Sequence, residues 1–82
     1  MIKLQEYQRA VLTNDLPEHD LQAGDTGIVV MIHGDHAGYE LEIFSVEGKT
    51  LDVVTVNADQ VRSIDARDIW HVRSVQSGIL HA

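Results

Sequence analysis

Apolar and polar residues alternate strictly along one segment of this 82-residue chain. Tyr39, Leu41 and Ile43 are apolar, and Glu40 and Glu42 stand between them. A period of two places the apolar side chains on one face of an extended strand and the carboxylates on the other. The segment is therefore predicted to be a β-strand with one buried face and one solvated face.

Further short segments rich in β-branched and apolar residues lie between turn signals. Together with the alternating segment, the predicted strands cover residues 9–13, 27–32, 39–44, 51–56 and 61–64. A single helical turn capped by Asn57 is predicted over residues 57–60.

Short strands spaced in this way are typical of an antiparallel sandwich or barrel. In so short a chain a barrel removes sheet edges with the fewest residues. We therefore expect an all-β fold, a small SH3-like barrel of about five antiparallel strands.

The hairpin between the third and fourth strands is expected to have a tight turn. Residues 48–49 place glycine first, as a type II′ turn prefers. A two-residue turn at this point would pair Leu41 with Val56 and Ile43 with Val54, which keeps the apolar residues on one face.

Two glycines three residues apart precede the second strand. Gly24 and Gly27 are expected to bracket a tight bend, because glycine adopts positive φ without steric cost. Asp25 between them is predicted to bond backbone amides of the turn. These three residues are assigned a structural role.

The segment 65–75 follows the predicted barrel and also alternates in part. It is predicted to be an additional C-terminal strand, paired with an edge of its own barrel or of a neighbouring subunit. The whole chain, residues 1–82, is expected to form one domain, with a barrel core over about 8–64 and an extension over 65–82.

This C-terminal segment carries the only tryptophan of the chain. Because aromatic side chains with a polar edge are enriched at interfaces, the candidate contact surface for self-association or a partner is Ile69, Trp70, Val72 and Val75. The alternative is that Trp70 caps the open end of the barrel.

Charge and cysteine content narrow the function classes. Thirteen acidic and six basic residues give a net charge of −7, which opposes binding to nucleic acid. The absence of cysteine excludes disulfides and thiolate chemistry and favours the cytoplasm. No segment is apolar enough for a signal peptide or a membrane span, so we expect no membrane partner.

One triplet and one cluster suggest chemistry. Asp25-Thr26-Gly27 spells the aspartic-protease motif, in which two aspartates share a proton, but here it leads directly into a strand. A small hydrolase using Asp25 is thus a less favoured alternative to a turn aspartate.

The cluster is His33, Asp35 and His36, whose side chains are of types that zinc or nickel accepts. A structural site usually needs four ligands, and the alternative is a solvated hairpin tip. We expect no bound metal and no cofactor.

Six motifs in order resemble the bacterial family called domain of unknown function 4926. They are Ala10-Val-Leu-Thr13, Asp15-Leu-Pro-Glu18, Leu21-x-x-Gly-Asp-x-Gly27, Tyr39-Glu-x-Glu42, Ala58-Asp-Gln60 and Ile69-x-His-Val-Arg73. The resemblance implies a small SH3-type barrel, in some cases encoded beside toxin-like genes, and it implies no catalytic residue.

These observations favour a non-catalytic protein-interaction module rather than an enzyme. We expect it to self-associate as a homo-oligomer through the segment 69–75 and nearby loops. The alternatives are an antitoxin or immunity-type partner of a toxin protein and an accessory subunit of a larger enzyme.

Overall fold

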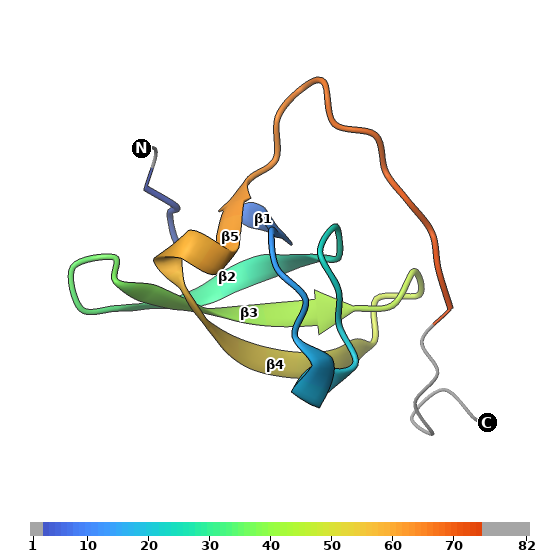
Figure 1. The fold of residues 1–82 in the computed structure, drawn as a ribbon, viewed down its shortest axis with the longest axis horizontal. Helices are drawn as coiled ribbons and strands as arrows, with labels where there is room; N and C mark the ends of the chain where they lie inside the picture. The colour runs from blue at the N-terminus through green and yellow to red at the C-terminus, as the bar shows by residue number, and fades with distance from the viewer. Residues whose placement is uncertain (1–2, 75–82) are drawn as a thin grey trace.

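A computed structural model of the chain describes residues 3–74 (Figure 1). The predicted contact residue Val75 lies outside the described residues. The described elements are β1 (Arg9–Leu12), η1 (Pro17–His19), β2 (Thr26–His33), β3 (Gly38–Phe44), β4 (Thr50–Asn57), η2 (Ala58–Gln60) and β5 (Val61–Ser63), where η1 and η2 are single 3-10 turns.

The five strands form one antiparallel sheet in the order β4-β3-β2-β1-β5. The all-β class and the five antiparallel strands are therefore confirmed, and the sheet is consistent with a small barrel-like domain. Within the described residues the edge strands β4 and β5 do not pair with each other, so the sheet is open where the sequence predicted a closed barrel.

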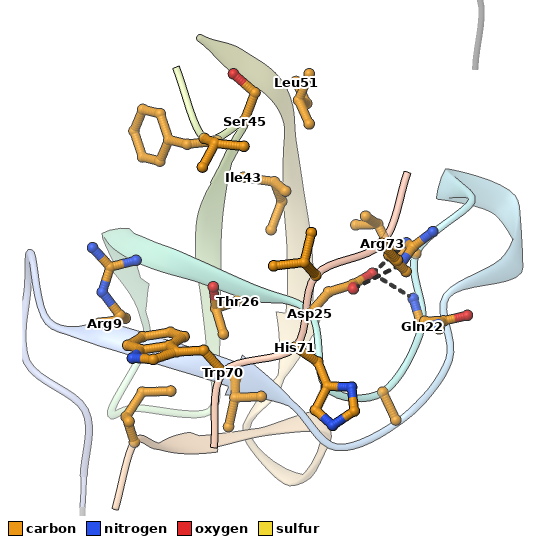
Figure 2. Close-up of a pocket in the computed structure, with 18 of the residues that line it drawn as sticks. Arg9, Gln22, Asp25, Thr26, Ile43, Ser45, Leu51, Trp70, His71 and Arg73 are labelled. Atoms are coloured by element: carbon orange, nitrogen blue, oxygen red, sulfur yellow. Dashed lines mark hydrogen bonds and ion pairs between the residues drawn. The ribbon is translucent and has the colours of Figure 1, made fainter. Parts of the chain in front are cut away.

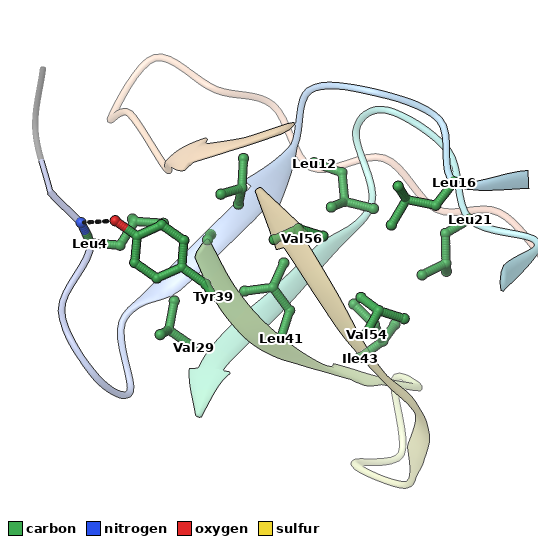
Figure 3. Close-up of a cluster of buried hydrophobic side chains, with 12 residues drawn as sticks. Leu4, Leu12, Leu16, Leu21, Val29, Tyr39, Leu41, Ile43, Val54 and Val56 are labelled. Carbon is green, nitrogen blue, oxygen red and sulfur yellow. Dashed lines mark hydrogen bonds between the residues drawn. The ribbon is translucent and has the colours of Figure 1, made fainter. Parts of the chain in front are cut away.

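The core lies against one face of this curved sheet (Figure 3). The alternation in β3 buries Tyr39, Leu41 and Ile43, and β4 contributes Val54 and Val56 from the neighbouring strand. All fully buried residues of the described chain are apolar. The remaining members of the cluster are Leu4, Ala10, Leu12, Leu16, Leu21, Val29 and Val61.

The register of the β3–β4 hairpin differs from the prediction by two residues. Leu41 pairs with Val54, and Tyr39 pairs with Val56. The shift preserves the buried face because a displacement of two keeps every side chain on its own side.

The reason for the shift is the turn. The Ser45 N–H donates to the Lys49 carbonyl at 2.8 Å, and the Gly48 N–H donates to the Ser45 carbonyl at 2.9 Å. Gly48 has φ +87°, so the loop has three residues with the last one left-handed, rather than two residues with glycine first. A register shift between Ile43 and Phe44 accompanies it.

Two short turns flank the sheet. The predicted turn before β5 is present as η2, where the Asn57 N–H donates to the Gln60 side chain at 2.8 Å. The sequence analysis missed η1, which lies between Leu16 and Leu21, two buried leucines joined by a bridge.

The additional C-terminal strand predicted over 65–75 is absent from the described residues. Residues 64–74, which we call the strap, leave β5 and arc around the side of the sheet (Figure 1). The Asp68 N–H donates to the Asp65 carbonyl at 2.9 Å, which makes a turn directly after β5. Because β5 is only three residues long, it offers little edge for a sixth strand.

Candidate functional site

A hollow of about 1020 Å³ separates the strap from one end of the sheet. The sheet side is lined by the turn before β2, by Ile28 and Ile43, and by the end of β3 with its loop, including Phe44 and Val46. The strap supplies residues 68–74 on the other side (Figure 2). The hollow therefore exists because the strap is held away from the sheet.

The first anchor of the strap is the pair Arg62–Asp68. The two terminal guanidinium nitrogens of Arg62, Nη1 and Nη2, donate to the two carboxylate oxygens of Asp68 at 2.9 Å each. The Asp65 N–H donates to the same carboxylate at 2.6 Å. The hydrogen bonds from Arg62, followed by the one from the Asp65 backbone, lower the pKa of Asp68 to about 2. This anchor thus fixes the start of the strap beside β5.

The second anchor joins residues 48 positions apart in the sequence. Arg73 Nε donates to Asp25 Oδ1 at 2.9 Å, and Arg73 Nη2 donates to Asp25 Oδ2 and, at 3.1 Å, to the Asp20 carbonyl (Figure 2). The hydrogen bonds to Asp25 raise the pKa of Arg73. A paired fork of this kind fixes direction as well as distance.

Between the anchors, Trp70 lies against an arginine of β1. The Arg9 guanidinium carbon is 5.5 Å from the centroid of the Trp70 ring (Figure 2). This is cation–π distance. Within residues 3–74 Arg9 makes no ion pair with a carboxylate.

The predicted contact residues of the strap face water. Ile69 is 84% exposed, Trp70 62% and Val72 89%. The structure therefore brings three of the four predicted contact residues into one exposed apolar segment held between the two anchors. It does not place them on the open end of a closed barrel.

Gly24 and Gly27, the two glycines predicted to form the bend before β2, have different structural roles. Gly24 has φ +98°, as a bend requires. Gly27, by contrast, lies inside β2, and a Cβ there would stand 2.8 Å from the Glu42 carbonyl oxygen. Gly27 is required by close packing of β2 on β3 rather than by the bend, which corrects the sequence interpretation.

Asp25 is an acceptor within this turn and for the strap. Its Oδ2 accepts from the Gln22 N–H at 2.9 Å, in addition to the two bonds from Arg73. Both carboxylate oxygens are therefore already hydrogen-bonded. Asp25 thus bonds a backbone amide of the turn and also holds the strap.

The three members of the histidine cluster do not come together: His36 Nδ1 lies 3.8 Å from Asp35 Oδ1, but His33 is directed elsewhere. His33 Nε2 lies 2.9 Å from Glu40 Oε2 across the β2–β3 hairpin, while the Asp35 side chain is almost fully exposed. The His36 ring packs edge-on against Tyr39, and both of its nitrogens are buried without a hydrogen-bond partner in residues 3–74. No group of three potential metal ligands comes together in that part of the chain.

Sequence reasoning missed both anchors and the Arg9–Trp70 contact. The available signal was the interleaving of arginine and aspartate between Arg62 and Arg73. That signal predicts ion pairs but does not identify their partners, because Asp25 and Arg9 lie far away in the sequence.

In the described part of the chain, no helix is long and apolar enough to cross a membrane.

A comparison with known families identifies the family of this chain. The family described as Domain of unknown function (DUF4926) matches residues 6–63, which is more than half of the chain. The chain belongs to this family. No curated protein and no solved structure matches it.

The DUF4926 match ends at Ser63, the last residue of β5. It therefore covers the five strands, the turn that holds Asp25, and the positions of Arg9 and Arg62. The strap, including the Ile69–Arg73 part of the resemblance, follows the matched residues.

Proposed function

We propose that this DUF4926 protein is a non-catalytic protein-interaction module that self-associates through the strap. One observation carries the proposal: Ile69, Trp70 and Val72 are exposed together on a segment fixed at both ends by arginine–carboxylate pairs. A cluster of exposed apolar side chains on a small domain is typical of an interaction site.

The anchors support binding because they reduce the cost of ordering the segment. A free C-terminal segment would lose much backbone entropy when a partner bound it. A strap already held at Asp68 and Arg73 loses less, which is the usual advantage of preorganisation. The strap also carries Trp70, an aromatic residue of the kind that is enriched at the centre of interfaces.

Four of the ionisable groups around the hollow are paired with one another, and this pairing supports a binding role over a catalytic one. Asp25, Arg62, Asp68 and Arg73 are all engaged with one another in pairs. Groups that perform acid–base catalysis are usually poised near the working pH, whereas the pKa of Asp68 lies at about 2. The cysteine-free composition supports a cytoplasmic location for the module.

Light scattering coupled to size-exclusion chromatography tests the proposal on the full chain. The wild-type protein is expected to show a mass above that of the monomer, rising with concentration through the micromolar range. Trp70→Ala and Val72→Ser are expected to shift the protein to the monomer.

Val53→Ser is the matched control, because Val53 is an exposed valine on β4 that does not line the hollow. It should leave the mass unchanged. A wild-type chain that stays monomeric at every concentration contradicts self-association.

A further inference from the structure

We infer that two copies of this chain exchange their straps, so that Arg73 of each copy binds Asp25 of the other. The inference rests on the proposed self-association and specifies its geometry. In such a dimer, the strap of each copy would span the hollow of the other copy.

Within one copy the strap is fixed at both ends, but the two ends are held in different ways. The turn from Asp65 to Asp68 is tied to Arg62, which lies in the neighbouring strand of the same copy. Beyond it, residues 69–74 make no backbone–backbone hydrogen bond within the described chain. Their attachments run through two side chains, Trp70 and Arg73. The chain can thus swing away after Asp68 without breaking any element of the sheet.

The closed arrangement within one copy leaves apolar surface in water on both sides of the hollow. Ile69 and Val72 on the strap are exposed, and on the sheet side Val46 is 99% exposed and Phe44 38%. The strap spans the hollow without filling it, as the volume of about 1020 Å³ indicates. A second copy that approaches this side would bring apolar side chains against both surfaces.

Charge complementarity points to a second copy as the occupant. Arg73 of the strap donates to the Asp25 carboxylate and to the Asp20 carbonyl. Every copy of the chain carries both the donor and these acceptors. Arg9 likewise offers a cation without a carboxylate partner in residues 3–74, beside the Trp70 ring. Reciprocal exchange repeats the same contacts in a closed, two-fold arrangement, which is why exchange of an identical segment is a low-cost route to dimers.

A charge-reversal pair tests the exchange. Asp25→Arg and Arg73→Asp each place like charges at the second anchor, so each variant alone should be monomeric. In a mixture, the unchanged Arg73 of the first variant meets the unchanged Asp25 of the second, and the two substituted positions also carry opposite charges. The mixture should therefore form a heterodimer at least about tenfold more tightly than either variant forms a homodimer.

Arg67→Asp is the control for the mixture. Arg67 pairs only with Asp65 inside the strap and is far more exposed than Arg73. Because this variant keeps Asp25 and Arg73, it should dimerise by itself as the wild type does. Mixing it with Asp25→Arg should give no heterodimer as tight as that of the reversed pair. If the wild-type chain dimerises but the reversed pair stays monomeric on mixing, strap exchange is overturned while self-association stands. A monomeric wild type overturns both.

A second experiment keeps the ion pair intact, in case Asp25→Arg disturbs the turn. The chain has no cysteine, so a single thiol can be placed near each partner of the second anchor. Ala23→Cys lies two residues before Asp25 and Ser74→Cys directly after Arg73, both at exposed positions. A short bismaleimide should join one variant to the other in a mixture, giving a covalent heterodimer. A chain that carries both substitutions is the control. Exchange is refuted if its two thiols are joined within one chain while the mixture of single variants gives no covalent heterodimer.

Discussion

The β3 strand and the strap have comparable stretches of apolar and polar residues, but they differ in burial and in backbone pairing. Leu41 in β3 is fully buried, whereas Val72 in the strap is 89% exposed. β3 lies between β2 and β4 and pairs with both along its length. The strap pairs with no strand in the described residues and is held by side chains instead.

The difference shows what an alternating pattern specifies and what it does not. Alternation sorts side chains onto two faces, but a strand also needs backbone partners on its edges. β3 has such partners on both sides, while the strap follows a three-residue edge strand and starts with a turn. Stability should therefore depend strongly on β3, and association should depend on the strap.

The largest expected effect is at the centre of the buried face. Leu41→Ala removes a fully buried side chain and should lower the free energy of unfolding by about 3 kcal/mol, from the lost apolar transfer and the cavity. For a domain of this size, whose total stability is roughly 0.1 kcal/mol per residue, that is a large fraction. Urea denaturation followed by circular dichroism measures it.

Val72→Ala is the matching substitution in the strap. It should lower the free energy of unfolding of the monomer by no more than about 0.5 kcal/mol, because the side chain is exposed. Equal losses for the two variants would show that the strap is part of the core.

The next effect separates two kinds of glycine. Gly27→Ala should lower the free energy of unfolding by about 2 kcal/mol. The added Cβ would stand 2.8 Å from the Glu42 carbonyl oxygen and 2.9 Å from the Ile43 side chain. In Gly24→Ala the added Cβ has no neighbouring atom within 4 Å. This variant should lower the free energy of unfolding by about 1 kcal/mol, from the positive φ alone. Thermal melting of both variants gives the order, and a larger loss at Gly24 would contradict the close-packing role of Gly27.

Much of the sheet could be predicted from the sequence, because its elements are specified locally. The alternation in residues 39–44, the β-branched run that follows Gly27 and the capped turn at Asn57 each predict the element that the structure contains. The hairpin register could not be fixed, since Gly48 suits either a two-residue turn or the third position of a longer loop.

The site was predictable only in part. The sequence analysis predicted Ile69, Trp70 and Val72 as part of a contact surface, and the structure shows that these three side chains are exposed. The absence of a sixth strand was not readable, because it depends on where Arg62 and Arg73 find their carboxylates, and Asp25 is 48 residues from Arg73. Likewise, His33 turns to Glu40 rather than toward His36 because β2 and β3 pair in a particular register.

A smaller effect is expected at the second anchor. Asp25→Asn keeps an acceptor for the Gln22 amide but removes the charge that holds Arg73. Because the pair is partly exposed, the loss of unfolding free energy in dilute protein should stay under about 1 kcal/mol. The emission of Trp70, the single tryptophan, should change more clearly, as the strap is released.

Arg67→Ala is the matched control for that measurement, since its pair with Asp65 fixes nothing outside the strap. If Asp25→Asn leaves the Trp70 emission at the wild-type value, the second anchor does not position the strap.

The smallest effect is a pH dependence at the first anchor. The pKa of Asp68 is lowered from 3.8 to about 2, so in the folded chain this carboxylate stays charged at acidities where it is protonated in the unfolded chain. Its contribution is therefore fully present above pH 3.8 and is lost as the pH falls from there toward 2. Because the pair is exposed, solvent screens it and the effect on unfolding is slight. An NMR titration of the Asp68 carboxyl carbon should give a midpoint near 2 in the wild type. In Arg62→Ala the midpoint should rise toward 3.8 without reaching it, because the hydrogen bond from the Asp65 N–H remains. A wild-type midpoint near 3.8 would show that Arg62 does not hold the strap at its start.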